Sequence, residues 1–207
     1  MTRDLAKFES RDKVTDAVHP REAAKTQAHD IVIMTGPAGA GRSTAIRALE
    51  DLGFEAIDNL PLSFLPRLFA GPPLARPVVV GVDARNREFA IDRLTALLEE
   101  IAALVGRAPT LVYLDCDAGT LIRRYNETRR RHPLSPHETP QIGIDREVSL
   151  LAPLRARADV LIDTGALTPH ALRAEMERLF GPEDGATTLA LSLQSFSYKR
   201  GTPRGVD

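Results

Sequence analysis

A run of small residues, 36–44, is the part of the sequence whose residue types best suit a chemical role. It reads GPAGAGRST and follows the phosphate-loop pattern GxxxxGK(S/T), except that Arg42 replaces the lysine. Glycines let backbone amides turn towards a phosphate, and the helix expected to follow adds unpaired N–H groups and a positive dipole end. The residues expected to hold a nucleotide here are Gly36, Pro37, Ala38, Gly39, Ala40, Gly41, Arg42, Ser43 and Thr44. The alternative is a glycine-rich turn without a ligand.

Arg42 changes what this loop can be expected to do. Lysine places a compact ammonium between the outer phosphates, whereas arginine is a longer, planar fork that can bind phosphate in a bidentate way. The charge is kept, but the geometry for stabilising a transition state is altered. The sequence therefore predicts nucleotide binding with slow or absent hydrolysis.

Two acids at the ends of predicted strands, Asp83 and Asp115, are candidates for a second Mg²⁺ ligand beside Ser43. Ligands of open α/β sheets bind outside the carboxyl ends of the strands, so both acids are expected near the loop. Asp83 is the better candidate because Arg85 and Asn86 follow it and can contact a phosphate and a base or ribose. For Asp115, a helix cap or a solvated loop acid is an equal alternative. We therefore expect Mg²⁺ at Ser43 and Asp83.

Two further polar segments allow more than one interpretation. Asp58-Asn59-Leu60-Pro61 can contact a ligand or form a tight turn, since Asp, Asn and Pro all favour turns. The basic residues of 123–131 can close over a nucleotide as a lid, meet RNA phosphates, or form a solvated face. They are Arg123, Arg124, Arg129, Arg130 and Arg131, with His132 and His137 beyond them and a weaker tail cluster at Lys199, Arg200 and Arg204. No aromatic platform for RNA bases is evident within residues 30–180, and the five histidines lack metal-ligand spacing.

The elements that must position these residues alternate between strand and helix. Apolar runs predict strands at 31–35, 54–58, 78–83, 110–115 and 160–163. Helical spacing of apolar residues predicts helices at 43–52, 88–105, 118–130, 145–158 and 169–180, with Thr168 as an N-cap. Segments 61–77 and 131–144 are expected to be connections. This alternation predicts an α/β fold with a mostly parallel sheet covered on both faces.

Length, composition and charge exclude several classes of protein and of binding site. The chain has 207 residues and a net charge of -1, so bulk charge gives no reason to expect nucleic-acid binding. A single cysteine, Cys116, excludes an internal disulfide framework and a cysteine-based zinc site. No apolar run approaches the ~20 residues of a membrane helix, and the first residues lack a signal-peptide core, so a cytoplasmic protein is expected.

Three regions are expected along the chain. Residues 1–29 hold few large apolar side chains and are expected to form a flexible extension. Residues 30–182 form the nucleotide-binding domain. Residues 187–196 alternate as a one-sided strand, which predicts the start of a truncated second domain over 183–207; an edge strand on the same sheet is the alternative.

Several stretches together resemble one protein family. They are GPAGAGRST, LEDLGFEAIDNLP, VDARN, LDCDAGTLIRRYNETRRRHPLS and SFSYKRGTPRGVD, in this order from Ile31 to the end of the chain. In these stretches the chain resembles the RapZ family of bacterial nucleotide-binding RNase adapter proteins. The resemblance implies a P-loop NTPase- or kinase-like three-layer sandwich followed by a C-terminal domain.

The resemblance also implies ligands and partners. It carries an ATP motif onto residues 36–43 and a GTP motif onto Asp83, Ala84, Arg85 and Asn86, with weak hydrolysis of both nucleotides. It further implies homo-oligomers that present a small regulatory RNA to an endoribonuclease, in a system linked to amino-sugar synthesis. RNA binding is there attributed largely to the C-terminal domain.

Two other functions remain open from the residues alone. A small-molecule kinase could use the same fold, and Asp58 or Asp115 would then have to serve near the γ-phosphate. An RNA-binding protein with an inert phosphate loop is the third possibility.

Overall fold

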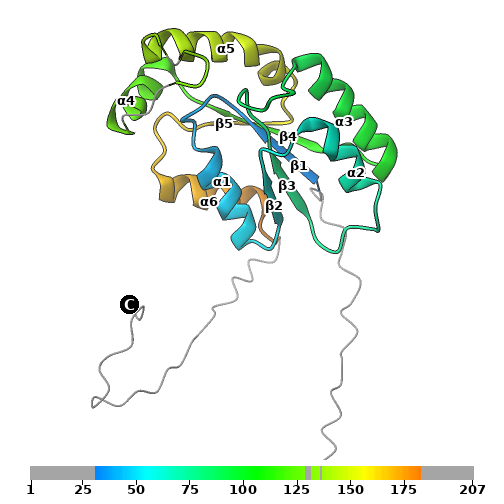
Figure 1. The fold of residues 1–207 in the computed structure, drawn as a ribbon. Coiled ribbons are helices and arrows are strands. Elements are labelled where there is room, and N and C mark those ends of the chain that lie inside the picture. The colour runs from blue at the N-terminus through cyan, green and yellow to red at the C-terminus, as the bar shows by residue number, and fades with distance from the viewer. Residues whose placement is uncertain (1–30, 129–131, 136, 183–207) are drawn as a thin grey trace, which may run out of the picture.

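A computed structural model of the chain describes residues 31–128, 132–135 and 137–182. Within these residues the strands form a five-stranded parallel sheet in the order β2-β3-β1-β4-β5 (Figure 1). The strands are β1 (Ile31–Thr35), β2 (Glu55–Asp58), β3 (Val78–Gly81), β4 (Thr110–Asp115) and β5 (Val160–Asp163). The predicted α/β class and parallel sheet are confirmed.

Helices cover both faces of this sheet (Figure 1). They are α1 (Arg42–Asp51), the short 3-10 helix η1 (Leu62–Phe64), α2 (Leu65–Phe69), α3 (Ile91–Val105), α4 (Ala118–Thr128), α5 (Pro140–Arg157) and α6 (Pro169–Phe180). Helices α1 and α6 pack on one face, and α2, α3 and much of α5 on the other. The result is the three-layer sandwich that was expected.

The apolar runs form strands because both faces of the sheet are buried. In β1, Val32 and Met34 join the cluster under α1 and α6, while Ile31 and Ile33 join the cluster under α2, α3 and α5. All five residues of β1 are buried. This explains why the run is continuously apolar rather than alternating.

Two predicted connections contain helices and were therefore wrong in part. Within 61–77 the chain forms η1 and α2, with a proline in the first turn of α2. Within 131–144 helix α5 already begins at Pro140. In both cases proline starts a helix, because its missing N–H is not needed in the first turn.

Most other boundaries lie close to the prediction. β4 and β5 have the predicted limits, β3 ends at Gly81 rather than at residue 83, and α3 begins at Ile91 rather than at residue 88. The Thr168 hydroxyl caps α6 as predicted by accepting the Ala171 N–H (3.1 Å). The predicted extension 1–29, Arg129–Arg131, the strand at 187–196 and the tail cluster lie outside the described residues. In the part that is described, no helix has the length and apolar composition of a membrane span.

Candidate nucleotide-binding site

The glycine-rich segment connects β1 to α1 as a tight loop. Gly36, Gly39 and Gly41 all have positive φ angles, of 144°, 95° and 98°. A Cβ atom on Gly36 would lie 2.3 Å from the Leu114 carbonyl oxygen, so the loop leaves β1 in backbone contact with β4. The Thr44 N–H donates to the Gly41 carbonyl (2.9 Å), which begins α1 directly from the loop. The backbone thus has the form predicted for a phosphate loop.

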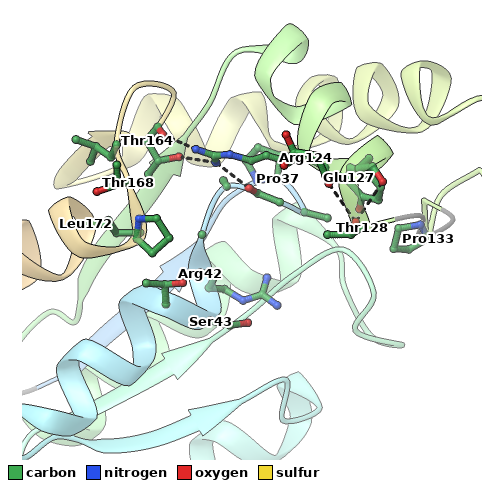
Figure 2. Close-up of a pocket in the computed structure, with 18 of the residues that line it drawn as sticks. Pro37, Arg42, Ser43, Arg124, Glu127, Thr128, Pro133, Thr164, Thr168 and Leu172 are labelled. Atoms are coloured by element: carbon green, nitrogen blue, oxygen red, sulfur yellow. Dashed lines mark hydrogen bonds between the residues drawn. The ribbon is translucent and has the colours of Figure 1, made fainter. Parts of the chain in front are cut away.

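A pocket of about 570 Å³ opens in front of this loop (Figure 2). Its walls come from the loop, the segment after β3, α4 and the segment after it, the β5–α6 connection and α6. The lining residues are Pro37, Ala38, Gly39, Ala40, Gly41, Arg42, Ser43, Thr44, Arg85, Arg124, Tyr125, Glu127, Thr128, Pro133, Thr164, Leu167, Thr168, Pro169 and Leu172. The volume is in the range of ordinary small-molecule sites, ~300–1,000 Å³.

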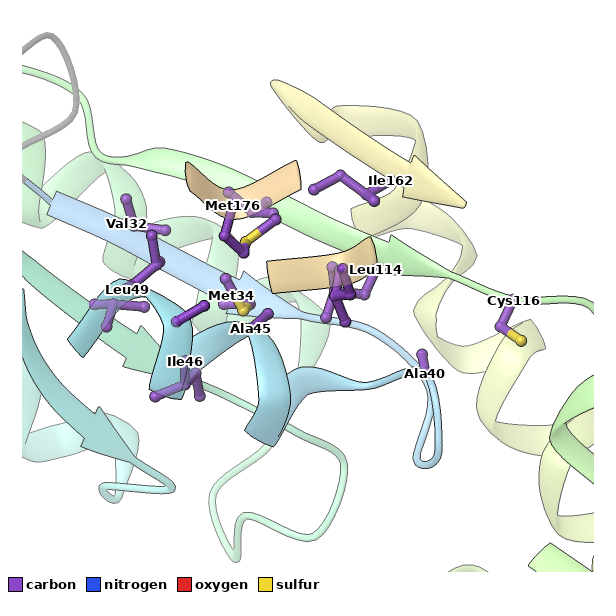
Figure 3. Packing of buried hydrophobic residues seen from close by; sticks show 14 of the residues in the cluster. Val32, Met34, Ala40, Ala45, Ile46, Leu49, Leu114, Cys116, Ile162 and Met176 are labelled. Atoms are coloured by element: carbon purple, nitrogen blue, oxygen red, sulfur yellow. The ribbon is translucent and has the colours of Figure 1, made fainter. Parts of the chain in front are cut away.

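Helix α1 is held under the loop by the core beside it (Figure 3). Ala45, Ile46 and Leu49 are buried in the same cluster as Met34 of β1. Ala40 of the loop is itself buried in this cluster, at 1% exposure. The loop is therefore anchored at its middle and at both ends, which keeps the N-terminus of α1 directed into the pocket.

Arg124 of α4 spans the pocket wall (Figure 2). Its guanidinium donates from Nη1 to the Gly39 carbonyl (2.9 Å) and from Nη2 to the Thr164 carbonyl (2.7 Å). These acceptors are neutral, so the contacts hold the side chain in place without cancelling its charge. Arg124 thus joins the phosphate loop to the β5–α6 connection and brings positive charge to the pocket.

Arg42, the residue at the usual lysine position, points to the ends of β2 and β3. Its Nη2 donates to Asp83 Oδ2, and its side chain is only 8% exposed. Its Nε lies 3.5 Å from Asp58 Oδ1, an ion-pair distance without hydrogen-bond geometry, and has no hydrogen-bond acceptor among the described residues. The structure therefore brings Arg42 together with both acids.

Asp83 is engaged by a second guanidinium. Arg85 Nε donates to Asp83 Oδ2 and the Arg85 backbone N–H donates to Oδ1, each at 2.8 Å. Burial alone would raise the pKa of Asp83, but the bonds from Arg85 and Arg42 outweigh it and hold this pKa below its usual value. The same ion pair raises the pKa of Arg85. Asp83 is thus an ionised, buried carboxylate enclosed by two arginines.

The predicted Mg²⁺ ligands fit a metal unequally. Ser43 is exposed in the first turn of α1, where its hydroxyl can reach into the pocket. Asp83 does not fit, since both of its oxygens already accept hydrogen bonds from arginine.

The neighbouring polar residues hold the loops around the site. Asn86 Nδ2 donates to the Leu60 carbonyl (2.7 Å) and its Oδ1 accepts the Glu88 N–H (3.0 Å), so this buried amide is directed to the β2–η1 connection. Asn59 has a positive φ of 58°, and its N–H donates to the Gly81 carbonyl (2.9 Å). The chain bends at Asn59 as it leaves β2, and Asp58 is 44% exposed beside Arg42, so a ligand contact at 58–61 stays a prediction. Ala84 contributes no polar side chain.

Asp115 at the end of β4 faces helix α5. Its Oδ2 accepts from Arg155 Nε (2.9 Å) and lies 2.8 Å from Arg155 Nη2. The ion pair raises the pKa of Arg155. Of the two strand-end acids considered for the metal, only Asp83 lies against the phosphate loop.

A buried pair that the sequence did not predict supports the start of the loop. Glu147 Oε2 accepts the Ala38 N–H (2.9 Å) and lies 3.1 Å from His132 Nε2. The His132 ring lies 5.1 Å from that of Tyr125 and is buried, so it forms no part of an open lid. Burial raises the pKa of Glu147, although the bonds from Ala38 and His132 oppose this effect. Two other residues of the predicted basic segment, Arg123 and His137, are exposed.

Comparison with known proteins assigns the fold and the family. Residues 29–184 match the RapZ-like N-terminal domain. The chain belongs to this family. It is 57% identical over 181 residues to a nucleotide-binding protein of Cereibacter sphaeroides (strain KD131), and 59% identical over 177 residues to one of Dinoroseobacter shibae. These alignments cover 87% and 86% of this chain but 60% and 59% of the relatives, so the chain spans about three fifths of their length.

Solved structures with low sequence identity share the fold of this RapZ-like domain. Shikimate kinase from Acinetobacter baumannii superimposes with a TM-score of 0.51 at 18% identity, covering 74% of this chain and 92% of the kinase. The YorR protein of Bacillus subtilis, solved with phosphorylated GDP, gives 0.51 at 14% identity, covering 72% and 94%. The expected P-loop kinase-like fold is confirmed.

Proposed function

We propose that this RapZ-like domain binds one nucleoside triphosphate, ATP or GTP, with its phosphates on the loop 36–44, and acts as a regulatory nucleotide-binding protein. The observation that carries the proposal is the open pocket in front of the glycine-rich loop, which Arg85 and Arg124 both line. Backbone N–H groups at a helix start, flanked by guanidinium groups, are suited to phosphate. The relatives named nucleotide-binding proteins support the same class.

The ATP motif and the GTP motif that the family resemblance implies are in contact, and this supports a single site for both nucleotides. The segment expected for ATP contributes Arg42 and the segment expected for GTP contributes Asp83, and these side chains are hydrogen-bonded to each other. Arg42 and Arg85 line the same pocket. ATP and GTP should therefore compete for one site on each chain.

Slow hydrolysis is supported by the direction of Arg42. Its guanidinium is paired with Asp83 and lies near Asp58, whereas a phosphate-loop lysine would reach the outer phosphates. The domain would then respond to which nucleotide is bound rather than to turnover.

Calorimetric titration with ATP and with GTP tests the proposal. We expect micromolar affinity, one nucleotide per chain, and complete displacement of bound GTP by ATP. Gly41→Val should weaken binding, because Gly41 has a φ of 98° and a Cβ there would lie 2.8 Å from Leu172 Cδ2. Arg178→Gln, at an exposed α6 residue paired with Glu175, is the matched control and should bind as the parent does. Absence of heat with either nucleotide would overturn the proposal.

The wider role rests on the family resemblance and is part of the same proposal: a homo-oligomeric cytoplasmic protein that modulates the decay of a small RNA by an endoribonuclease, in a system linked to amino-sugar metabolism. Because Arg124 faces the nucleotide pocket, RNA phosphates would have to be met by Arg123 and the following arginines of 129–131. RNA affinity that depends steeply on salt, and that falls when Arg129–Arg131 are reversed in charge, would support this role. Unchanged affinity in that variant would rule out this cluster as the contact to RNA.

A kinase is the second candidate, because Asp58 is 44% exposed at the end of β2, beside Arg42. Phosphoryl transfer needs an acid or base near the γ-phosphate, and Asp115 is paired with Arg155 instead. Turnover on a sugar or nucleoside at kinase rates of ~1–100 s⁻¹, abolished in Asp58→Asn, would favour this candidate.

A further inference from the structure

We propose that nucleotide binding to this domain does not require a divalent cation, because Arg42 and Arg85 occupy the carboxylate that would otherwise hold it. The inference rests on the proposed nucleotide site. It concerns the metal that a phosphate loop normally uses, and it follows from the partners of one buried side chain, Asp83.

The Asp83 carboxylate already accepts four hydrogen bonds from two arginines, three of them on Oδ2, so it is poorly available to a metal. An ionised carboxylate offers about four lone-pair sites. Oδ1 accepts the Arg85 backbone N–H, and Oδ2 accepts from Arg85 Nε, Arg85 Nη2 and Arg42 Nη2. Magnesium sites that bind nucleotides use one or two protein ligands besides the phosphates, and the ion gives up its water reluctantly. A carboxylate already enclosed by guanidinium groups is a poor replacement for that water.

Freeing Asp83 for a metal would leave Arg42 in an unfavourable state. Asp83 is 1% exposed and Arg42 is 8% exposed, so neither can turn into solvent easily. The Nε atom of Arg42 already lacks a hydrogen-bond acceptor among the described residues. Removing the bond to Asp83 as well would leave a buried charge with Asp58 alone beside it, and a buried charge that loses its partner is strongly destabilising.

The positive charge that a metal would bring is present in the side chains of the pocket. Arg85 is 50% exposed and lines the pocket from the segment between β3 and α3. Arg124 lines it from α4, with neutral carbonyls as its acceptors. A guanidinium has five N–H donors, and each of these two keeps hydrogens that its present bonds do not use, so the two arginines and the loop amides can share the charge of a polyphosphate between them.

Titrations with ADP and with a non-hydrolysable ATP analogue, in magnesium chloride and in EDTA, test the inference. We expect the two dissociation constants for each nucleotide to agree within about threefold, or binding to be tighter in EDTA. Affinity that is tenfold or more higher in magnesium would overturn the inference and leave the proposed function standing. Absence of binding in both buffers would overturn the proposed function and this inference with it.

Two variants show whether Asp83 acts as a metal ligand or as the partner of the arginines. Asp83→Asn, checked by circular dichroism for folding, should bind in EDTA at least as well as the parent because the half-exposed Arg85 is released towards phosphate. Arg85→Gln, which keeps the Arg42–Asp83 pair, should lose affinity about tenfold in both buffers alike, and Arg178→Gln should lose none. Weaker binding of Asp83→Asn in magnesium only, or an Arg85→Gln loss confined to one buffer, would contradict the inference.

Discussion

The imidazole Nε2 of His132 lies 3.1 Å from Oε2 of Glu147, and the same carboxylate oxygen accepts the Ala38 N–H of the phosphate loop at 2.9 Å. His132 Nδ1 accepts the Leu134 N–H (3.2 Å), which leaves the imidazole proton on Nε2 as the donor to Glu147. Both side chains are buried, at 1% exposure. One carboxylate therefore ties the segment between α4 and α5 to the loop expected to hold the phosphates.

Replacing Glu147 by alanine should destabilise the domain. The Ala38 N–H and the His132 Nε2–H would both lose their acceptor in a buried place, and each such loss costs about 1–3 kcal/mol. We expect the free energy of unfolding in urea to fall by about 2–5 kcal/mol. Glu147→Gln should lose much less, because its amide oxygen can accept the same two bonds.

Glu175→Ala is the matched control for that experiment. Glu175 also lies on a helix and is paired with an arginine, Arg178, but this pair is at the surface of α6. Surface pairs contribute ~0–1 kcal/mol. Equal losses in Glu147→Ala and Glu175→Ala would show that the bonds of Glu147 to the loop and to His132 add nothing to stability.

The pH dependence of stability should report the burial of Glu147. Burial is the chief cause that raises its pKa in the folded protein above the ordinary value of 4.5, so the folded state holds this proton more tightly than the unfolded state does. The stability linked to this group is complete below pH 4.5 and is lost as the pH rises through the folded pKa. The unfolding free energy of the parent minus that of Glu147→Gln should therefore fall as the pH rises from 4.5. A difference that stays constant or increases would contradict the burial effect.

The sequence predicted the layers of the fold but not two of its helices. β4 and β5 were predicted at their observed limits because both are short apolar runs between polar turns. α2 and the first turn of α5 were missed because each begins with or near a proline, in a stretch whose apolar spacing is short. A proline alone does not indicate whether a helix starts after it or the chain continues as a loop.

Within the site, residue types were predictable but their partners were not. The loop pattern pointed to residues 36–44, yet nothing local shows that Arg42 bonds Asp83, which is 41 residues away. Glu147 lies 109 residues from Ala38, so no local pattern shows that they are bonded. One signal in the sequence could have indicated that Glu147 is buried: it lies among the buried positions of α5, between Ile144 and Leu151. A charged residue within an apolar stripe needs a buried partner, and this is how it could have been found.

Arg124→Gln should weaken nucleotide binding by roughly tenfold, or ~1.4 kcal/mol. The change removes a positive charge from the pocket wall and the bonds to the Gly39 and Thr164 carbonyls. Calorimetry with ADP measures the effect, and Arg178→Gln serves as the control for loss of an arginine elsewhere. If both variants bind ADP as the parent does, Arg124 does not contribute to the site.

Gly36→Ala should separate the strain of the loop backbone from its contact with β4. Gly36 has a φ of 144° and a Cβ there would lie 2.3 Å from the Leu114 carbonyl oxygen, which is main chain and cannot move aside alone. Gly106→Ala is the matched control, since Gly106 has a φ of 80° but nothing lies within 4 Å of its added Cβ.

We expect urea unfolding to show a loss of about 1–2 kcal/mol for Gly106→Ala, from the left-handed conformation alone. The loss for Gly36→Ala should reach about 3 kcal/mol or more, since the overlap with β4 adds to the strain. Similar losses in the two variants would mean that the loop can withdraw from β4, and the close approach would then not hold the phosphate loop in place.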